Sequence, residues 1–486
     1  MAKADEPLYL AIDQGSHASR ALVFDGRGDV LARAHAEIDT LHPRDDWVEH
    51  DADALLDATR RVIDDSVQEL GTDIQRLQMA GLATQRSSIV CWDRDTGGPL
   101  SNVLSWRDRR AADWLADFEA EANRVHDITG LVLSPHYGAS KLHWCLQNLP
   151  EVAAALDSNR LALGPLSSFL AHRLAAGQPP LADPANASRT LLWDYRARDW
   201  SPELLKLFGV PTAGLPASVP SRHDFGTIAL GEHRCPLALV TGDQSAALFG
   251  LGEPATDTVY ANLGTGAFLQ QVVGGEPVAG PGLLSSVVYQ DAQRSMYVLE
   301  GTVNGAGGAL VAVADELGMD RDYLKAHSAR WLQHESDPPL FLNGVGGLGA
   351  PYWVADFPTR FVGRGHDAAK IVAVMESIVF LLVVNLEALA QCAPQPRRMI
   401  VTGGLAAVDP LCQRLADLSG LPVARPQIKE ATARGLGWLL AQRAGSWLPD
   451  AERSEFEPVA DQAFSQRYQR WRQAMEDQVQ ASGDES

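Results

Sequence analysis

The sequence predicts an α/β protein with two related halves, and three observations support this. Short apolar runs bounded by turn residues, which are typical of strands, alternate with segments of helical periodicity along the 486 residues. Two strand pairs, one near the start of the chain and one just past its middle, each enclose a polar turn that contains glycine. The length also suits about two to four domains. We therefore expect an α/β fold whose opening unit recurs in the second half.

Strands are expected where apolar runs flank turn chemistry. The turn that begins at Asp13 contains Gly15 and Ser16, and a similar turn is formed by Gly264 to Gly266. The strand pairs expected on this basis cover residues 8–12 with 21–24, both ends of 258–273, and 89–92 with 100–106.

Helices are expected between these strands. Apolar residues recur with helical spacing over 51–71 and 141–149, and the second segment stops before a proline, which cannot continue a helix. A glycine-rich stretch at 250–254 follows the first strand-rich region. We therefore predict an N-terminal domain over 1–252 and a C-terminal domain over 253–486.

Composition excludes several classes of protein. Hydrophobic residues make up 46% of the chain and charged residues 21%, so a predominantly disordered chain is excluded. The net charge of −20 opposes binding to a nucleic-acid backbone. The start of the chain lacks the basic region and apolar stretch of an export signal. We therefore expect no nucleic-acid partner and no export.

Cysteine usage and one apolar window bear on the compartment. The five cysteines lie far apart without metal-ligand spacing, which is typical of free thiols in a reducing compartment. The window 371–390 is long enough to cross a membrane, but it contains Glu376, Asn385 and Glu387, which would be costly in hydrocarbon. We therefore expect a cytoplasmic protein with a buried helix at this window and no membrane insertion.

Phosphate binding requires backbone N–H groups or hydroxyls that converge on oxygen atoms, and a carboxylate to hold a metal ion. The P-loop pattern is absent from the sequence. The turn from Asp13 to Arg20 instead offers a carboxylate, a glycine, two hydroxyls and a fixed cation, although a plain hairpin turn has a similar composition. The turns at 264–266 and 403–404 add two further candidates at strand ends.

Nine short motifs follow one another between about Leu8 and Leu440. They are Asp13-Gln14-Gly15-Ser16 with Arg20, Thr84-Gln85-Arg86, Trp106-Arg107-Asp108-Arg109, Thr129-Gly130-Leu131, Gly242-Asp243-Gln244, Gly264-Thr265-Gly266, Glu300-Gly301, the segment from Gly346 to Trp353, and Gly403-Gly404. In order and spacing they resemble the motifs of the FGGY carbohydrate kinases, and within that family those of the glycerol kinases most. Each motif is only modestly specific, but their common order makes chance an implausible source.

The resemblance implies two ribonuclease-H-like domains of the actin type, with ATP and a small polyol or sugar bound in the cleft between them. It implies transfer of the γ-phosphoryl group of ATP to a hydroxyl of that substrate. Asp243 would be the general base, Arg20 the second catalytic residue and Asp13 the residue that holds Mg²⁺. By position, the residues around the phosphates would be Ser16, His17, Arg20, Gly264 and Thr265, those near the nucleoside Gly307 and Gly404, and those lining the substrate pocket Arg86, Ser87, Trp106, His136, Asp243, Gln244 and Phe268.

These residue types suit phosphoryl transfer, in which positioning and charge neutralisation carry the rate. An apolar wall from Trp106 and Phe268 would pack against the carbon skeleton of the substrate, while Arg86 and Gln244 would satisfy its hydroxyls. A structural alternative exists for Asp243, because helical residues follow it at once and Asp is a preferred N-cap residue. The two roles are compatible.

Several positions depart from the resemblance. Ser87 stands where glycerol kinases carry Glu, and His136 where they carry a substrate-contacting Tyr. The smaller, neutral Ser87 opens room for a four- or five-carbon polyol or ketose, whereas a divergent glycerol kinase would use Tyr137 and Ser88 in place of the two lost contacts. The choice between glycerol and a larger substrate stays open.

The nucleotide side departs as well. His17 and Ala18 replace two hydroxyl residues of the phosphate turn, while Val311 and Val408 replace a Gln and an Asn on the adenine side. These changes favour a second hypothesis, a nucleotide- or sugar-binding regulatory protein of the same fold with little or no turnover. Assembly into a homo-oligomer is also left open.

Overall fold

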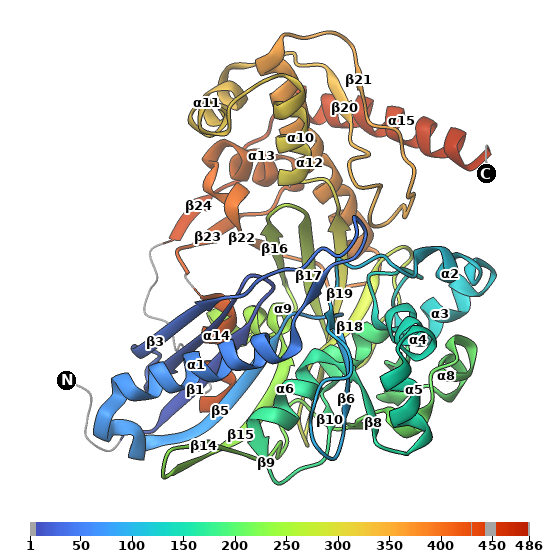
Figure 1. Cartoon of the computed structure of the whole chain (residues 1–486). Helices are drawn as coiled ribbons and strands as arrows, with labels where there is room; N and C mark the ends of the chain where they lie inside the picture. The colour runs from blue at the N-terminus through green and yellow to red at the C-terminus, as the bar shows by residue number, and fades with distance from the viewer. Residues whose placement is uncertain (1–5, 429, 443–452, 485–486) are drawn as a thin grey trace.

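A computed structural model describes residues 6–428, 430–442 and 453–484 of the chain (Figure 1). The described residues form two large mixed sheets, each of seven strands. The first sheet has the order β3 (Val30–Glu37), β2 (Ala18–Phe24), β1 (Leu8–Gln14), β5 (Leu77–Thr84), β15 (His233–Gly242), β14 (Thr227–Leu230) and β9 (Ala175–Ala176). The second has the order β18 (Leu284–Gln290), β19 (Ser295–Val303), β17 (Ala267–Gly274), β16 (Thr258–Leu263), β22 (Arg398–Thr402), β23 (Val423–Pro426) and β24 (Arg453–Phe456).

The two sheets share one arrangement of strands. In the first, β1 pairs antiparallel with β2 and parallel with β5, which in turn pairs parallel with β15. In the second, β16 pairs antiparallel with β17 and parallel with β22, which pairs parallel with β23. The two predicted hairpins and the α/β class are therefore confirmed, and each half has a ribonuclease-H-like order of strands.

The third expected strand pair forms only in part. β6 (Ile89–Asp93) and β7 (Val103–Leu104) are paired at one position, Ile89 with Leu104, because most of the second segment is loop. These strands belong to a small sheet in the order β4 (Glu49–His50), β7, β6 and β8 (Leu161–Pro165). Two further two-stranded sheets join β10 (Leu181–Ala182) to β13 (Ala217–Ser218) and β11 (Trp193–Asp194) to β12 (Asp199–Trp200).

The first predicted helix is confirmed, and the structure shows a cap at each of its ends. α1 (Ala52–Leu70) begins after Asp51, whose carboxylate accepts the Ala54 N–H at 2.8 Å, and it ends at Gly71, whose φ of 56° suits a residue without a Cβ. The second corresponds to α4 (Gly138–Asn148). The other helices of the first half are α2 (Ala112–Ala116), α3 (Ala122–Thr129), α5 (Pro150–Asp157), α6 (Leu166–Leu174), α7 (Pro184–Ala187), α8 (Pro202–Phe208) and α9 (Asp243–Leu248).

The apolar window of the sequence forms α12 (Asp367–Ala390), a core helix of the second half. Within the described ranges it is the one helix long and apolar enough to cross a membrane, yet 94% of its apolar window is buried inside the protein. Its buried Glu376 accepts charged hydrogen bonds from Arg414 at 2.5 Å and Arg467 at 2.6 Å. Around α12 lie α10 (Gly307–Glu316), α11 (Arg321–His334), α13 (Asp409–Ser419), α15 (Gln462–Asp484) and the strands β20 (Leu340–Leu342) and β21 (Arg360–Val362) (Figure 1).

One late helix belongs to the first half by its packing. α14 (Ala431–Ala441) contacts α9, β1 and β5, and Figure 1 shows it among elements from the start and middle of the chain. Gly435 permits this close crossing, because a Cβ at that position would overlap the Ala246 carbonyl. A domain boundary at residue 252 stays a prediction. α14 lies after that boundary in the sequence but packs against elements that precede it.

Candidate active site

Two predicted carboxylates lie at the carboxyl ends of neighbouring parallel strands. Asp13, near the end of β1, is level with Ala83 of β5, and Gly242, the last residue of β15, is level with Thr84. Asp243 follows directly as the first residue of α9. Because adjacent strands lie about 4.8 Å apart, β1 and β15 flank β5 at about 10 Å from each other. Asp13 and Asp243 therefore face the same end of the first sheet.

Asp13 is buried beside one cation. Its side chain is 8% exposed, and Arg20 on β2 places Nη1 3.6 Å from Oδ2. Burial raises the pKa of Asp13 to about 7, and the nearby charge of Asp243 adds to this, while Arg20 opposes it. Glu430, at the start of α14, contacts Arg20 Nε at 3.5 Å. The Asp13 carboxylate therefore lacks enough positive charge around it to be ionised at low cost.

Asp243 does not cap its helix. The N-cap of α9 is Gly242, and Asp243 Oδ1 instead accepts the N–H of the next residue, Gln244, at 2.7 Å. The alternative of an N-cap role for Asp243 is therefore wrong, because the helix begins one residue earlier than that role requires. Burial raises the pKa of Asp243, and the guanidinium groups of Arg86 and Arg189 act against this rise.

A buried triad of charges joins the two halves beside Asp243. Arg86 from the first half donates to Glu300 Oε1 of β19 at 3.4 Å, and Arg189 donates to the same oxygen. All three side chains are at most 8% exposed. Burial alone would raise the pKa of Glu300, but the two guanidinium groups outweigh it and hold that pKa at about 2. Arg86 also donates to Gln244 Oε1, which fixes its guanidinium next to the carboxylate of Asp243.

The residues predicted to line the substrate pocket include a pair of aromatic rings and a buried hydroxyl group. The rings of Trp106 and His136 lie 5.4 Å apart between centroids. The pKa of His136 lies well below its usual value because of burial and of cations that include Lys141, so the ring is neutral at pH 7. Ser87 is 4% exposed and adopts a φ of 63°, and among the described residues its buried Oγ has no hydrogen-bond partner. Phe268 of β17 is half-buried.

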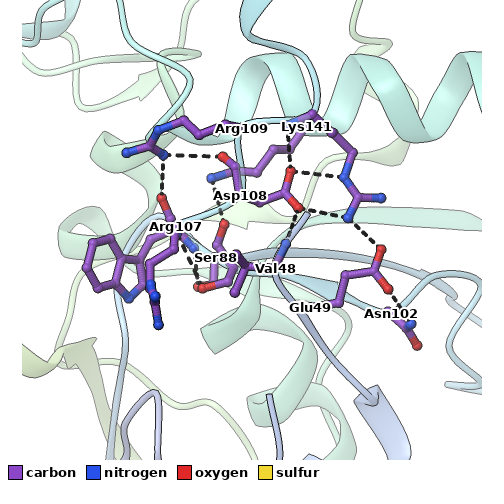
Figure 2. A network of polar contacts seen from close by, with 11 residues as sticks. Val48, Glu49, Ser88, Asn102, Arg107, Asp108, Arg109 and Lys141 are labelled. Carbon is purple, nitrogen blue, oxygen red and sulfur yellow. Dashed lines mark hydrogen bonds and ion pairs between the residues drawn. The ribbon is translucent and has the colours of Figure 1, made fainter. Parts of the chain in front are cut away.

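The loop that carries Trp106 is anchored by a buried polar network (Figure 2). Asp108, at its centre, accepts the Val48 N–H at 2.8 Å and the Arg110 Nε–H at 2.9 Å. Arg110 also contacts Glu49 at 2.5 Å, and Asn102 donates to Glu49 at 2.6 Å. Fully paired networks of this kind rigidify the segment that they connect.

Lys141 of α4 connects this loop to the neighbouring one. Its Nζ donates to the Ser105 carbonyl at 3.2 Å and to the His136 carbonyl at 2.7 Å, and its side chain is 1% exposed. Burial lowers the pKa of Lys141 well below its usual range. The amine thereby links the two backbone segments that carry Trp106 and His136.

The predicted nucleotide side is formed by backbone. Gly264 and Thr265 make the turn between β16 and β17, and their carbonyls accept the first N–H groups of α10, from Gly307 at 3.0 Å and Gly308 at 2.8 Å. A Cβ at Gly307 would lie 2.8 Å from the Gly264 carbonyl oxygen. Thr265 itself is exposed. The close approach of the helix to this turn therefore requires Gly307.

The other predicted glycine lies beside a more constrained one. Gly404 has open space where a Cβ would be, whereas Gly403 has a φ of 93° and a Cβ there would lie 2.6 Å from the Leu263 carbonyl. Leu263 and Gly403 follow the paired residues Asn262 and Thr402 of parallel β16 and β22, so the two turns lie side by side. Val311 is on α10 and Val408 is the N-cap residue of α13. His17, in the turn between β1 and β2, is exposed.

Sequence reasoning missed Arg189 and Lys141, and it gave no role of their own to Glu300 and Gly403, which lie within two of the motifs. Glu300 occurs within one of the motifs, but its pairing with Arg86 spans 214 residues and has no local signal. Lys141 gave no clear local signal, because its helical segment also contains Ser140, His143 and Gln147.

Comparison with known proteins assigns the chain to a family of enzymes. Residues 8–250 match the N-terminal domain of the FGGY family of carbohydrate kinases, and residues 259–443 match the C-terminal domain. The chain belongs to this family and is a carbohydrate kinase. It is 34% identical to the glycerol kinase of Alcanivorax borkumensis, over 96% of this chain and 98% of that one.

Solved structures show the same fold. The structure of Plasmodium falciparum glycerol kinase with ADP matches with a TM-score of 0.86 at 22% identity, over 97% of this chain and 98% of that chain. The xylulose kinase of Rhodospirillum rubrum matches with a TM-score of 0.84 at 18% identity, over 96% and 97% of the two chains. The fold is therefore that of a two-domain kinase of the actin-type ATPase class, and membership of the family implies the use of ATP to phosphorylate a sugar or polyol.

Proposed function

We propose that this kinase phosphorylates a four- or five-carbon polyol or ketose, with Asp243 as the general base and Asp13 as the residue that holds Mg²⁺. The observation that carries the proposal is the position of these two carboxylates on either side of β5, with the paired Arg86 beside Asp243. An acceptor hydroxyl and a phosphoryl group brought to this strand end would both be within reach of an ionisable group.

In this mechanism Asp243 accepts the proton of the acceptor hydroxyl as the bond to phosphorus forms. Its raised pKa makes it a stronger base than an exposed Asp, while Arg86 and Arg189 limit that rise. Arg86 is held in place by Glu300 and would bind a second hydroxyl of the acceptor. Arg20 would neutralise charge on the transferred phosphoryl group.

The residues present fit a divalent cation at Asp13. The carboxylate is buried, and its pKa of about 7 reflects burial and the neighbouring Asp243, so a cation would relieve an unfavourable charge. Carboxylate oxygens are hard donors, which Mg²⁺ prefers. Mg²⁺ bound here with ATP would supply charge neutralisation for the phosphates. Ser16, His17, Gly264 and Thr265 would surround those phosphates, with Gly307 and Gly404 nearer the nucleoside.

The size of the substrate is inferred from Ser87 and His136. The Ser87 hydroxyl is buried and has no hydrogen-bond partner in the described part of the chain, which is costly unless a ligand group satisfies it. The neutral His136 can both donate to and accept from a hydroxyl, and Trp106, Gln244 and Phe268 would complete the pocket. A substrate with more hydroxyls than glycerol would use both groups.

The test is coupled release of ADP with Mg²⁺-ATP, comparing glycerol with erythritol, xylulose and ribulose. We expect a four- or five-carbon acceptor to give the highest kcat/KM. Asp243→Asn should lower kcat by about 10²–10⁴-fold with little change in nucleotide affinity, because one positioned base contributes that much. Asp157→Asn, at an exposed position, is the matched control.

Each other outcome has a distinct meaning. Preference for glycerol would contradict the proposed substrate, and full activity of Asp243→Asn would contradict the proposed base. Ligand-induced thermal stabilisation without ADP release from any acceptor would instead support a regulatory protein. Ser87→Glu combined with His136→Tyr should shift the preference toward glycerol if these two positions determine the pocket.

A further inference from the structure

Four residues between the two predicted ligand sites form a closed ring of hydrogen bonds. Trp106 is held at two points: its indole Nε1–H donates to Ser16 Oγ at 3.0 Å, and its backbone N–H donates to Ser88 Oγ at 3.1 Å. Both hydroxyls then donate to one atom, Gln85 Oε1, Ser16 at 3.2 Å and Ser88 at 3.0 Å. The indole therefore cannot turn without breaking a bond to the turn after β1.

The direction of every bond in this ring is determined. The N–H groups of Trp106 can only donate, so each serine hydroxyl accepts from Trp106 and has its single proton left for Gln85. The amide of Gln85 must then point its oxygen at the serines, which turns its Nε2 toward Gln14 Oε1 at 3.5 Å. Gln14 in turn donates to the Gly15 carbonyl at 2.6 Å. One chain of oriented dipoles thus runs from Trp106 to the backbone of the turn.

Burial makes this chain stiff. Gln85 and Ser88 of the ring, and Gln14 next to it, are at most 2% exposed, so hydrogen bonds at this inner side are strong and broken ones are costly. At one end, Trp106 faces His136 in the predicted acceptor pocket. At the other end, Ser16 and Gly15 follow Asp13 in the predicted phosphate turn.

We propose that the ring of Ser16, Gln85, Ser88 and Trp106 couples the acceptor pocket to the phosphate turn, so that an acceptor seated on Trp106 raises the affinity for ATP. Ser16, Gln85 and Ser88 are positioning residues in this role, because they act through Trp106 and the turn. The inference rests on the proposed function, which assigns Trp106 to the acceptor. An acceptor that restrains the indole also restrains Ser16 and hence the turn, so the second ligand binds to a site that is already ordered.

The test measures how each ligand changes the affinity for the other. Titration calorimetry would give the dissociation constant of a non-hydrolysable ATP analogue with Mg²⁺, with and without the acceptor that the kinase prefers. Couplings of this kind are typically about 5–150-fold in affinity. Trp106→Phe keeps an aromatic ring but removes the indole N–H, and Ser16→Ala removes the hydroxyl. We expect both variants to bring the coupling close to onefold, and the double variant to lose no more than either single variant.

Control variants separate coupling from folding. Trp114→Phe changes a tryptophan stacked on His143 at 3.9 Å, and Ser158→Ala changes an exposed residue at the C-cap of α5. Both should leave the coupling unchanged. Ser16 is only half-buried, so Ser16→Ala tests the ring even if another variant is destabilised.

Two results would overturn the inference, and they can be told apart. Coupling in Trp106→Phe and Ser16→Ala equal to that of the natural protein would show that the ring does not carry it, while the proposed function would stand. If the natural protein binds the nucleotide but no polyol or ketose, the proposed function fails and the ring couples nothing.

Discussion

The acceptor side and the nucleotide side of this kinase are built from different materials. On the acceptor side, side chains form the site: Arg86 is fixed by Glu300, and the loop of Trp106 is held by Asp108 and Lys141. On the nucleotide side, the first N–H groups of α10 are bound to the carbonyls of the 264–265 turn. This close approach requires a residue without a Cβ at Gly307.

This difference fits what each side must recognise. Side chains differ in shape and charge, so a site made from them distinguishes one acceptor from another. Backbone N–H groups are the same in every protein, and they suit a ligand whose phosphates do not vary. We therefore expect mutations to act through lost partners on the acceptor side and through added atoms on the nucleotide side.

The largest effect is expected at Glu300. Glu300→Gln keeps the shape but leaves Arg86 and Arg189 buried without a carboxylate, which should lower the free energy of unfolding by about 3–5 kcal/mol. Thermal unfolding followed by circular dichroism would measure this. Glu253→Gln is the control, because Glu253 and Arg294 are more than two-fifths exposed and such pairs contribute about 0–1 kcal/mol. Equal losses of unfolding free energy in the two variants would show that the buried pair of the acceptor side contributes no more than an exposed pair.

An intermediate effect is expected at Gly307. Gly307→Ala places a Cβ 2.8 Å from the Gly264 carbonyl oxygen, and relieving such overpacking costs about 1–3 kcal/mol. The KM for ATP should rise about tenfold with little change in the KM for the acceptor. Gly404→Ala meets nothing within 4 Å and should raise the KM for ATP less. Steady-state kinetics with each substrate varied in turn would show whether the two glycines differ.

The smallest effect is a dependence on pH. The pKa of Glu300 is held at about 2, below its usual value of 4.5, so the unfolded chain binds this proton more readily than the folded protein. The stabilisation by Glu300 is therefore complete above pH 4.5 and is lost as the pH falls toward 2. The difference in melting temperature between the natural protein and Glu300→Gln should narrow between pH 7 and pH 3. A difference in melting temperature that does not change with pH would mean that the Glu300 carboxylate does not provide this stabilisation.

Local chemistry made much of the fold predictable. The turns at 13–16 and 264–266 are signals carried by a few adjacent residues, and the helix over 51–71 is signalled by its own periodicity. Both hairpins and α1 form at these positions. The first residue of α9 could not be predicted in this way, because a helix capped by Gly242 and one capped by Asp243 have nearly the same sequence pattern. The short pairing of β6 with β7 depends on neighbours in the small sheet and could not be predicted from that segment alone.

The site was predictable as a set of positions and not as a set of contacts. The motifs indicated Arg86 and Asp243, but the pairing of Arg86 with Glu300 arises only when the two sheets come together. In the same way, the sequence could not indicate that the Ser16 hydroxyl accepts the indole N–H of Trp106, 90 residues away. Such partners are set by tertiary packing, which periodicity and turn chemistry do not encode.

The position of α14 constrains how this gene can be divided. Its apolar residues Leu436, Trp438 and Leu440 are buried in one cluster with residues of β1 and β2 from the start of the chain. A fragment that ends at residue 252 would expose that surface to water, and exposed apolar patches promote aggregation. A split version of the kinase, or a chimera that exchanges its N-terminal portion for that of a relative, would therefore need to carry α14 together with the strands that it covers.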